Sequence, residues 1–188
     1  MEQQLRFLEP DEIERLLAVP NLRATTGFRN RIICQLQWEC GLRISEALNL
    51  RPRDVVIAEN KLTVQRGKGG KTRVVYWRSD ELSMMLERWK KKRPPSDYLF
   101  PTIRSKAGKG KRIEPRQYRS QFDRYVVKAG LPEWTTTHVL RHSFATQFLR
   151  DGGNIRILQI CLGHASLATT ERYLHVTSAD VAKAMRGY

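Results

Sequence analysis

Residues 137–176 read THVLRHSFATQFLRDGGNIRILQICLGHASLATTERYLHV and hold the most informative pattern in the chain. Apolar residues recur there at the spacing of amphipathic helices, and glycines interrupt the pattern at three positions. We therefore predict three helices, at about residues 138–150, 154–162 and 167–175. Histidine, arginine and tyrosine side chains are set among the apolar positions, so the same helices could present reactive groups.

The preceding part of the chain mixes helical and strand-like patterns. Runs of β-branched and aromatic residues predict strands at 55–57, 62–64 and 73–77, with a glycine-rich turn, RGKGGK, between the last two. Helical spacing and loop composition predict the other elements: helices from Pro10, at about 28–40, around 44–50, from Asp80, at 115–129 and at 178–185, and a mobile loop at 104–112. No repeat or long linker divides the chain, so we expect one domain over residues 1–188. Its class would be α+β, mainly α, with a small three-stranded antiparallel sheet.

Charge and cysteine content limit the possible partners and compartment. The chain of 188 residues carries a formal net charge of +15, which favours a nucleic acid partner, DNA or RNA, over a solubilising surface or a ribosomal or membrane-surface role. Its three cysteines are an odd number, which argues against a disulfide framework. No segment resembles a signal peptide or a membrane span. We expect a soluble, cytoplasmic, nucleoid-associated protein with no membrane partner.

Two arginines are candidates for binding a phosphodiester. Arg43 lies at a helix junction in ECGLRISEALNL, and Arg141 lies three residues after His138 on one predicted helical face. A guanidinium group donates two parallel hydrogen bonds to phosphate oxygens and stays protonated, which suits a transition state that gains negative charge. An arginine near a helix start is also common in surface salt bridges.

Tyr173 is the candidate nucleophile. A phenol with an ordinary pKa is only about 0.1% ionised at neutral pH, so it needs a base or a cationic environment. His138 or the phosphate itself could accept its proton, and His164, placed after a glycine at a predicted helix start, could donate to a phosphate oxygen. A core or capping role is the alternative for each histidine. Lys68, at the predicted hairpin tip, could protonate the departing 5′ oxygen, with Lys71 as a competitor.

Two other motifs, a nucleotide-binding P-loop and a zinc-protease histidine pair, do not match this sequence. The GGKT segment lies between two predicted strands, and the first glycine of a P-loop would fall on Gln65. His138 and His142 have the spacing of a zinc-protease pair, but Val139 stands where the general-base glutamate belongs. Cys161 and His164 supply too few ligands for zinc. The sequence therefore predicts neither a metal nor a cofactor.

Four segments together resemble the tyrosine recombinase, or phage integrase, family: ECGLRISEALNL, RGKGGKTR, THVLRHSFATQFL and LGHASLATTERYLHV. The resemblance runs from about residue 5 to the end. It implies the fold of DNA breaking and rejoining enzymes and assigns a role to each matching position. Arg43 and Arg141 would bind phosphate, His138 and His164 would be the active-site histidines, Lys68 the general acid and Tyr173 the nucleophile, while Glu46 would support the first arginine.

The resemblance also implies the reaction and its partners. Tyr173 would form a 3′-phosphotyrosyl bond on double-stranded DNA, and two rounds of exchange through a Holliday junction would complete recombination in a homotetramer, with accessory DNA-bending proteins as possible partners. Relatives carry an additional N-terminal core-binding domain, which we expect to be absent from this chain. The alternatives are a DNA-binding accessory protein of the same fold that does not cleave, and a relaxing enzyme like the type IB topoisomerases.

Overall fold

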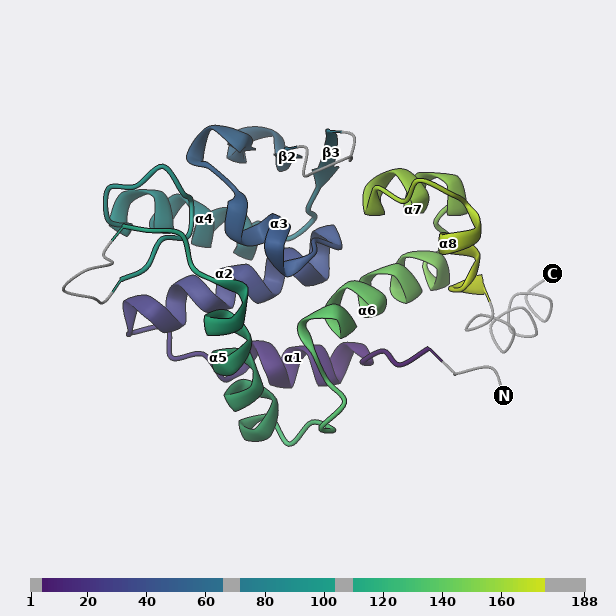
Figure 1. Cartoon of the computed structure of the whole chain (residues 1–188), viewed down its shortest axis with the longest axis horizontal. Coiled ribbons are helices and arrows are strands. Elements are labelled where there is room, and N and C mark those ends of the chain that lie inside the picture. The colour runs from purple at the N-terminus through teal and green to yellow at the C-terminus, as the bar shows by residue number, and fades with distance from the viewer. Residues whose placement is uncertain (1–4, 66–71, 104–109, 175–188) are drawn as a thin grey trace.

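The computed structural model describes residues 5–65, 72–103 and 110–174 (Figure 1). The fold is mainly helical with one small sheet, as predicted. The α-helices of the described residues are α1 (Pro10–Ala18), α2 (Thr25–Cys40), α3 (Ile44–Asn49), α4 (Asp80–Lys92), α5 (Pro115–Lys128), α6 (Thr137–Arg150), α7 (Ile155–Leu162) and α8 (Ala168–Glu171).

Helix α2 is the central element of the fold. It packs against α1, α3, α4 and α6, and it is buried around most of its circumference, which explains why its sequence lacks a clear polar face. The Gln37 side chain is buried in this helix, and its amide nitrogen donates to the carbonyls of Leu42 and Thr137, at 3.4 and 3.1 Å, while its Oε1 has no hydrogen-bond partner among the described residues. The helix ends where predicted, at Gly41, whose φ of 61° lies in the left-handed region.

The sheet is antiparallel, with strands β1 (Val55–Val56), β2 (Lys61–Val64) and β3 (Arg73–Tyr76) in that order. Leu62 pairs with both Val55 and Val75, and all three side chains are buried. The predicted first strand is too long, because Ile57 already begins a 3-10 helix over Ile57–Glu59. Trp77 likewise lies just beyond β3.

Three predicted features fall partly or wholly on residues that the structure does not describe. The hairpin turn with Lys68 and Lys71 lies within residues 66–71, most of the loop at 104–112 lies within 104–109, and the helix at 178–185 lies within 175–188. These predictions stay untested. In the described ranges, no helix is both long enough and apolar enough to cross a membrane.

The C-terminal segment differs from prediction in two ways. Gly163 ends α7 with a φ of 65°, and the backbone N–H groups of Gly163 and His164 donate to the carbonyls of Ile160 and Gln159, at 3.0 and 3.1 Å. These two bonds form a Schellman motif, so His164 follows a helix end rather than beginning a helix. The predicted helix at 167–175 is also too long: α8 stops at Glu171, and Tyr173 lies in the following turn.

Two hydrophobic clusters position the candidate site residues. The larger one lies around α2 and joins α1, α3, α4, α5 and the sheet. The smaller one lies between α6, α7 and the turn after α8. Its buried members are Phe144, Ala145, Leu158, Leu162 and Tyr173. Figure 1 shows α7 and α8 together at one end of the molecule, with β3 facing α7. Tyr173 is thus anchored by packing, although its own backbone is not helical.

Candidate active site

Arg141 joins the C-terminal ends of two helices. From α6, its Nη1 donates to the carbonyl of Gly41, after α2, and its Nη2 donates to the carbonyl of Leu162, the last residue of α7, both at 2.7 Å. A cation is favoured at a helix C-terminus, where unpaired carbonyls point outward. Burial, and then the charge of Arg43, lower the pKa of Arg141 to about 10, so the guanidinium remains charged at neutral pH.

Glu46 gathers three arginines around one carboxylate. Arg73 binds it at two points, Nη1 to Oε1 at 2.9 Å and Nη2 to Oε2 at 2.8 Å. Arg43 donates to it through its backbone N–H at 2.8 Å and through Nη1 at 3.2 Å, and Arg141 Nη1 lies 3.7 Å from Oε2. Burial acts to raise the pKa of Glu46, but the bonds and charge of Arg73 and Arg43 outweigh it, and the pKa lies below its usual value.

The three guanidinium groups differ in their access to solvent. The side chain of Arg43 is 41% exposed, whereas those of Arg73 and Arg141 are 8% and 5% exposed. Arg73 also donates through Nε to the carbonyl of Cys161 at 2.7 Å. Arg73 was missed in the sequence, where it stands only as the first residue of a predicted strand. Arg43 therefore offers the open positive charge, and the two buried arginines hold the framework around it.

His164 is held in one tautomer by its neighbours. Its Nε2 lies 3.1 Å from Arg141 Nη2, and because arginine can only donate, Nε2 must accept. Its Nδ1, 2.9 Å from Thr170 Oγ1, then carries the proton and donates to the hydroxyl. Burial, Arg141 and Arg43 lower the pKa of His164 to about 4, so the ring is neutral at physiological pH. Both ring nitrogens are engaged in this structure, and neither is free to donate to a phosphate as the sequence suggested.

His138 lies at the open edge of the same cluster. It occupies the first turn of α6, as predicted, and its side chain is exposed. Partial burial of the ring, together with the charges of Arg119, Arg141 and Arg43, lowers its pKa. Arg119 comes from α5 and Arg43 from the residue before α3, so three elements direct positive charge toward this position. Such a convergence of cations would attract an anion.

Tyr173 is buried between two histidine rings. The residue is 1% exposed, and its hydroxyl oxygen lies 2.9 Å from Nδ1 of His142. The His164 ring is parallel to the phenol ring, at 8° and 6.5 Å between centroids, and the His142 ring is tilted by 46° at 5.7 Å. The Arg172 guanidinium lies 6.0 Å from the centre of the phenol ring. The sequence considered His142 only as half of a metal pair, and its place after Arg141 gave no sign of this contact.

The electrostatic state of the phenol and its partner follows from this burial. Burial raises the pKa of Tyr173, while Arg141, Arg172 and Arg43 oppose that change without cancelling it. Burial, Arg172, His138 and Arg141 lower the pKa of His142 to about 4. The phenol is consequently protonated at neutral pH and donates to an unprotonated imidazole nitrogen. The site combines a fixed cationic cluster with a neutral hydroxyl, which is the composition needed to bind a phosphate and attack it.

Most of the predicted site residues meet in one place. The structure brings together five of them through direct contacts: Arg43, Glu46 and Arg141 through the carboxylate, His164 through Arg141, and Tyr173 through its stacking on His164. His138 joins them through its electrostatic coupling to the arginines. Lys68 lies outside the described residues.

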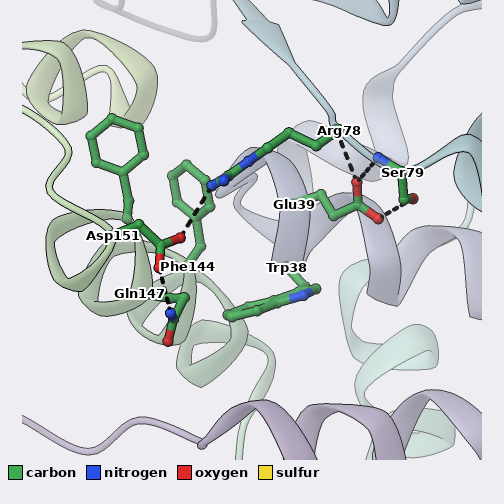
Figure 2. A pocket seen from close by; sticks show the side chains of 8 residues that line it. Trp38, Glu39, Arg78, Ser79, Phe144, Gln147 and Asp151 are labelled. Carbon is green, nitrogen blue, oxygen red and sulfur yellow. Dashed lines mark hydrogen bonds and ion pairs between the residues drawn. The ribbon is translucent and has the colours of Figure 1, made fainter.

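A separate hollow adjoins the smaller hydrophobic cluster, and none of the site residues above lines it (Figure 2). Its lining residues are Trp38, Glu39, Arg78, Ser79, Phe144, Gln147, Phe148 and Asp151. Figure 2 shows Arg78 extending toward Asp151, with 3.6 Å between Nη2 and Oδ2, and Glu39 accepting hydrogen bonds from Ser79. Polar groups at the rim of this hollow thus bond mainly to one another.

Comparison with known proteins identifies the family. Residues 6–180 match the model of the phage integrase family. The chain belongs to the phage integrase family. Curated relatives are named as tyrosine recombinases: XerA of Pyrococcus horikoshii is 37% identical over 181 residues, XerD of Pseudomonas putida is 33% identical over 181 residues, and XerC of Rhizobium meliloti is 39% identical over 155 residues. These alignments cover 96%, 93% and 80% of this chain, but only 60%, 58% and 46% of the relatives.

Solved structures of phage integrase family members share the fold. A crystal structure of XerA recombinase superposes with a TM-score of 0.82 at 31% identity, covering 100% of this chain and 66% of that one. XerH recombinase bound to its palindromic difH substrate, in a post-cleavage complex, gives 0.80 at 28% identity, covering 97% and 53%. The catalytic domain of bacteriophage HP1 integrase gives 0.66 at 32% identity, covering 97% and 94%. The chain therefore spans between 46% and 66% of the length of these longer relatives.

Proposed function

We propose that this chain is the catalytic part of a site-specific DNA recombinase that cleaves and rejoins strands through a 3′-phosphotyrosyl intermediate. The observation that carries the proposal is the stacking of the Tyr173 ring on His164, whose imidazole is bonded to Arg141 in the arginine cluster around Glu46. Family membership supports it, as do the names of the relatives as tyrosine recombinases and the capture of XerH with its DNA substrate.

Each residue has a role that follows from its contacts. Arg43, the most exposed of the three guanidiniums, would bind the non-bridging oxygens of the scissile phosphate. Arg141 would supply a second positive charge from a fixed position, and His138 would stand at the open edge as a further donor. His164 would hold Arg141, and Glu46 would hold the arginines in register. Preorganised charge of this kind lowers the barrier because it needs no rearrangement during the reaction.

The chemistry conserves the energy of the broken bond. The Tyr173 oxygen would attack phosphorus, the bond to the 5′ oxygen would break, and Lys68 would protonate that oxygen as it leaves. The 5′ hydroxyl of a partner strand would then attack the phosphotyrosyl bond and release the phenol. We further propose two such rounds through a Holliday junction, within a homotetramer on paired DNA sites, with accessory DNA-bending proteins. Residues 1–188 would act as a single catalytic domain.

A nicked suicide substrate tests the proposal directly. The probe is a nicked duplex with two inverted half-sites, selected from a randomised library by its binding to this chain. We expect the chain to become covalently attached to the 3′ phosphate, and Tyr173→Phe to bind the same DNA without attachment, since only one hydroxyl is removed. An attached Tyr173→Phe variant would reject this tyrosine as the nucleophile. Binding without attachment by the parent chain would instead indicate an accessory protein.

A second assay separates recombination from DNA relaxation. Two labelled duplexes that both carry the selected site are mixed with the chain, and a supercoiled plasmid with one site is treated in parallel. Strand exchange between the duplexes would support a recombinase. Relaxation of the plasmid without any exchange product would support an enzyme like the type IB topoisomerases.

A further inference from the structure

His142 has no role in the chemistry described so far, yet it is the residue that touches the reactive oxygen. We propose that His142 is the general base of cleavage, the group that takes the proton from Tyr173 as the phenol attacks phosphorus. The inference rests on the proposed function, because it requires Tyr173 to be the nucleophile. It assigns a catalytic role to a residue that the sequence analysis considered only as half of a rejected metal pair.

The geometry suits a direct proton transfer. The hydroxyl oxygen of Tyr173 lies 2.9 Å from His142 Nδ1, inside the range of about 2.6–3.2 Å over which a base can take a proton. The phenol is the donor, since burial favours its neutral form. His142 must therefore present an unprotonated Nδ1 and carry its own proton on Nε2. This tautomer is the one a proton acceptor needs before the reaction begins.

Neighbouring histidines are less suited to the task. The Nε2 of His164 accepts from Arg141 and its Nδ1 donates to Thr170, so neither nitrogen has a lone pair directed at the phenol. His138 is exposed at the start of α6, and among the described residues the hydrogen bond of the phenol goes to His142, one turn further along the same helix. The sequence had offered His138 or the phosphate as proton acceptor, and the contact favours His142 over both.

The positive charges around His142 make its proton affinity depend on whether DNA is bound. Burial lowers the pKa of His142 most, and Arg172 beside Tyr173, with His138 and Arg141 on α6, lowers it further, to about 4 in the free chain. A phosphate placed against Arg43 and Arg141 adds negative charge close to these cations and raises the proton affinity of the imidazole. The base thus becomes stronger when the substrate is in place, and remains weak without it.

The proton balance of the step is complete. The O–H bond of Tyr173 breaks and its proton moves to Nδ1 of His142, while the phenol oxygen forms the bond to phosphorus and the bond to the 5′ oxygen breaks. The 5′ oxygen receives a proton from the acid, proposed above as Lys68. In the rejoining step the imidazolium returns its proton to the phenol oxygen, so His142 ends each cycle in its starting form.

Two substitutions at this position separate proton transfer from orientation. In His142→Asn, the amide oxygen can stand near the position of Nδ1 and accept the phenol hydrogen bond, but it cannot take the proton. His142→Ala removes both properties and leaves a small space. We expect the single-turnover rate of covalent attachment to the nicked duplex to fall by about 10²–10⁴-fold in both variants. DNA affinity should change little, and Gln147→Ala, on α6 but outside the site, should react like the parent.

Imidazole in solution supplies the decisive readout. Added imidazoles of increasing pKa should restore attachment by His142→Ala, with a rescued rate that rises with the pKa of the added base, as proton transfer requires. An Asn variant that reacts within threefold of the parent would overturn the inference, and so would an unrescued Ala variant that folds and binds DNA. If the parent chain forms no covalent bond to DNA through Tyr173, the proposed function fails together with this inference. If the parent chain reacts and His142→Asn reacts equally well, only the role of His142 as general base is rejected.

Discussion

Arg73 and Glu46 form a two-point ion pair that ties the first residue of β3 to α3, with bonds of 2.9 and 2.8 Å. Both side chains are largely buried, at 8% and 16% exposure. The same carboxylate binds Arg43 and lies near Arg141, so a single negative charge accompanies three positive ones. The excess positive charge is therefore held in place by the fold before any phosphate arrives.

Glu46→Gln should destabilise the protein strongly. The amide has nearly the same shape, but the buried guanidinium of Arg73 loses its compensating charge, and breaking a buried pair in this way costs about 3 kcal/mol. Urea unfolding followed by circular dichroism measures the change. The matched control is Arg78→Ala, which removes an exposed pair with Asp151 whose side chains are 77% and 41% exposed, and should cost less than about 1 kcal/mol. Equal losses in the two variants would contradict the assigned importance of Glu46.

Replacing Arg43 and Arg141, the two arginines proposed to bind phosphate, should have different effects on stability. Arg141→Ala removes two bonds to helix-end carbonyls from a buried site, which should cost about 2–4 kcal/mol of unfolding free energy. Arg43→Ala removes a half-exposed side chain and should cost less than about 1 kcal/mol. Cleavage should fall by about 10²–10³-fold or more in both. An Arg43→Ala variant that cleaves within tenfold of the parent would remove Arg43 from the phosphate site.

Gly41→Ala should be much more harmful than Gly130→Ala, although the two glycines have nearly the same φ, 61° and 62°. A Cβ at Gly41 would stand 2.4 Å from Cδ1 of Phe144, whereas at Gly130 it would meet nothing within 4 Å. Left-handed strain alone should cost about 1 kcal/mol, and the clash should add about 2 kcal/mol at Gly41. Thermal unfolding of the two variants compares them, and similar midpoints would contradict this account.

Acidification should weaken the fold before the carboxylates are fully protonated. The pKa values of His142 and His164 are about 4 in the folded chain, below the value of about 6.5 expected when unfolded. The unfolded chain then binds more protons between these limits, so stability should fall as the pH is lowered from about 6.5 to 4. Proton NMR of the histidine rings measures the midpoints directly. A midpoint above pH 6 for either ring would show that the imidazole is not buried against cations as described.

Local patterns predicted most of the fold because they depend on neighbours in sequence. Gly41 ended α2 as expected, and the alternation around Leu62 and Val75 produced the antiparallel sheet. The end of α8 was mispredicted, since the helical spacing continues past Glu171 while packing of Tyr173 into the smaller hydrophobic cluster turns the chain. Periodicity carries no information about such tertiary contacts.

The sequence predicted which residues belong to the candidate site better than it predicted their contacts with one another. Arg43, Arg141 and Tyr173 stood in recognisable motifs, and the fold brings them together. The partners of these residues depend on segments far apart in sequence: Arg73 reaches Glu46 from a different element, and His142 reaches Tyr173 across 31 positions. Single-sequence patterns do not specify such long-range pairs, so both residues became visible only in three dimensions.

The Schellman motif at Gly163 fixes the position of His164 in the candidate site. Because the carbonyl of Leu162 is held by Arg141 and the next two N–H groups are used within the motif, the chain leaves α7 in one direction only. His164 is thereby delivered to the same guanidinium that fixes the helix end. A mutation that disrupts the end of α7 would displace both the Arg141 guanidinium and the His164 ring, because each is held at this helix end. The geometry of the candidate site would then be lost in one step rather than gradually.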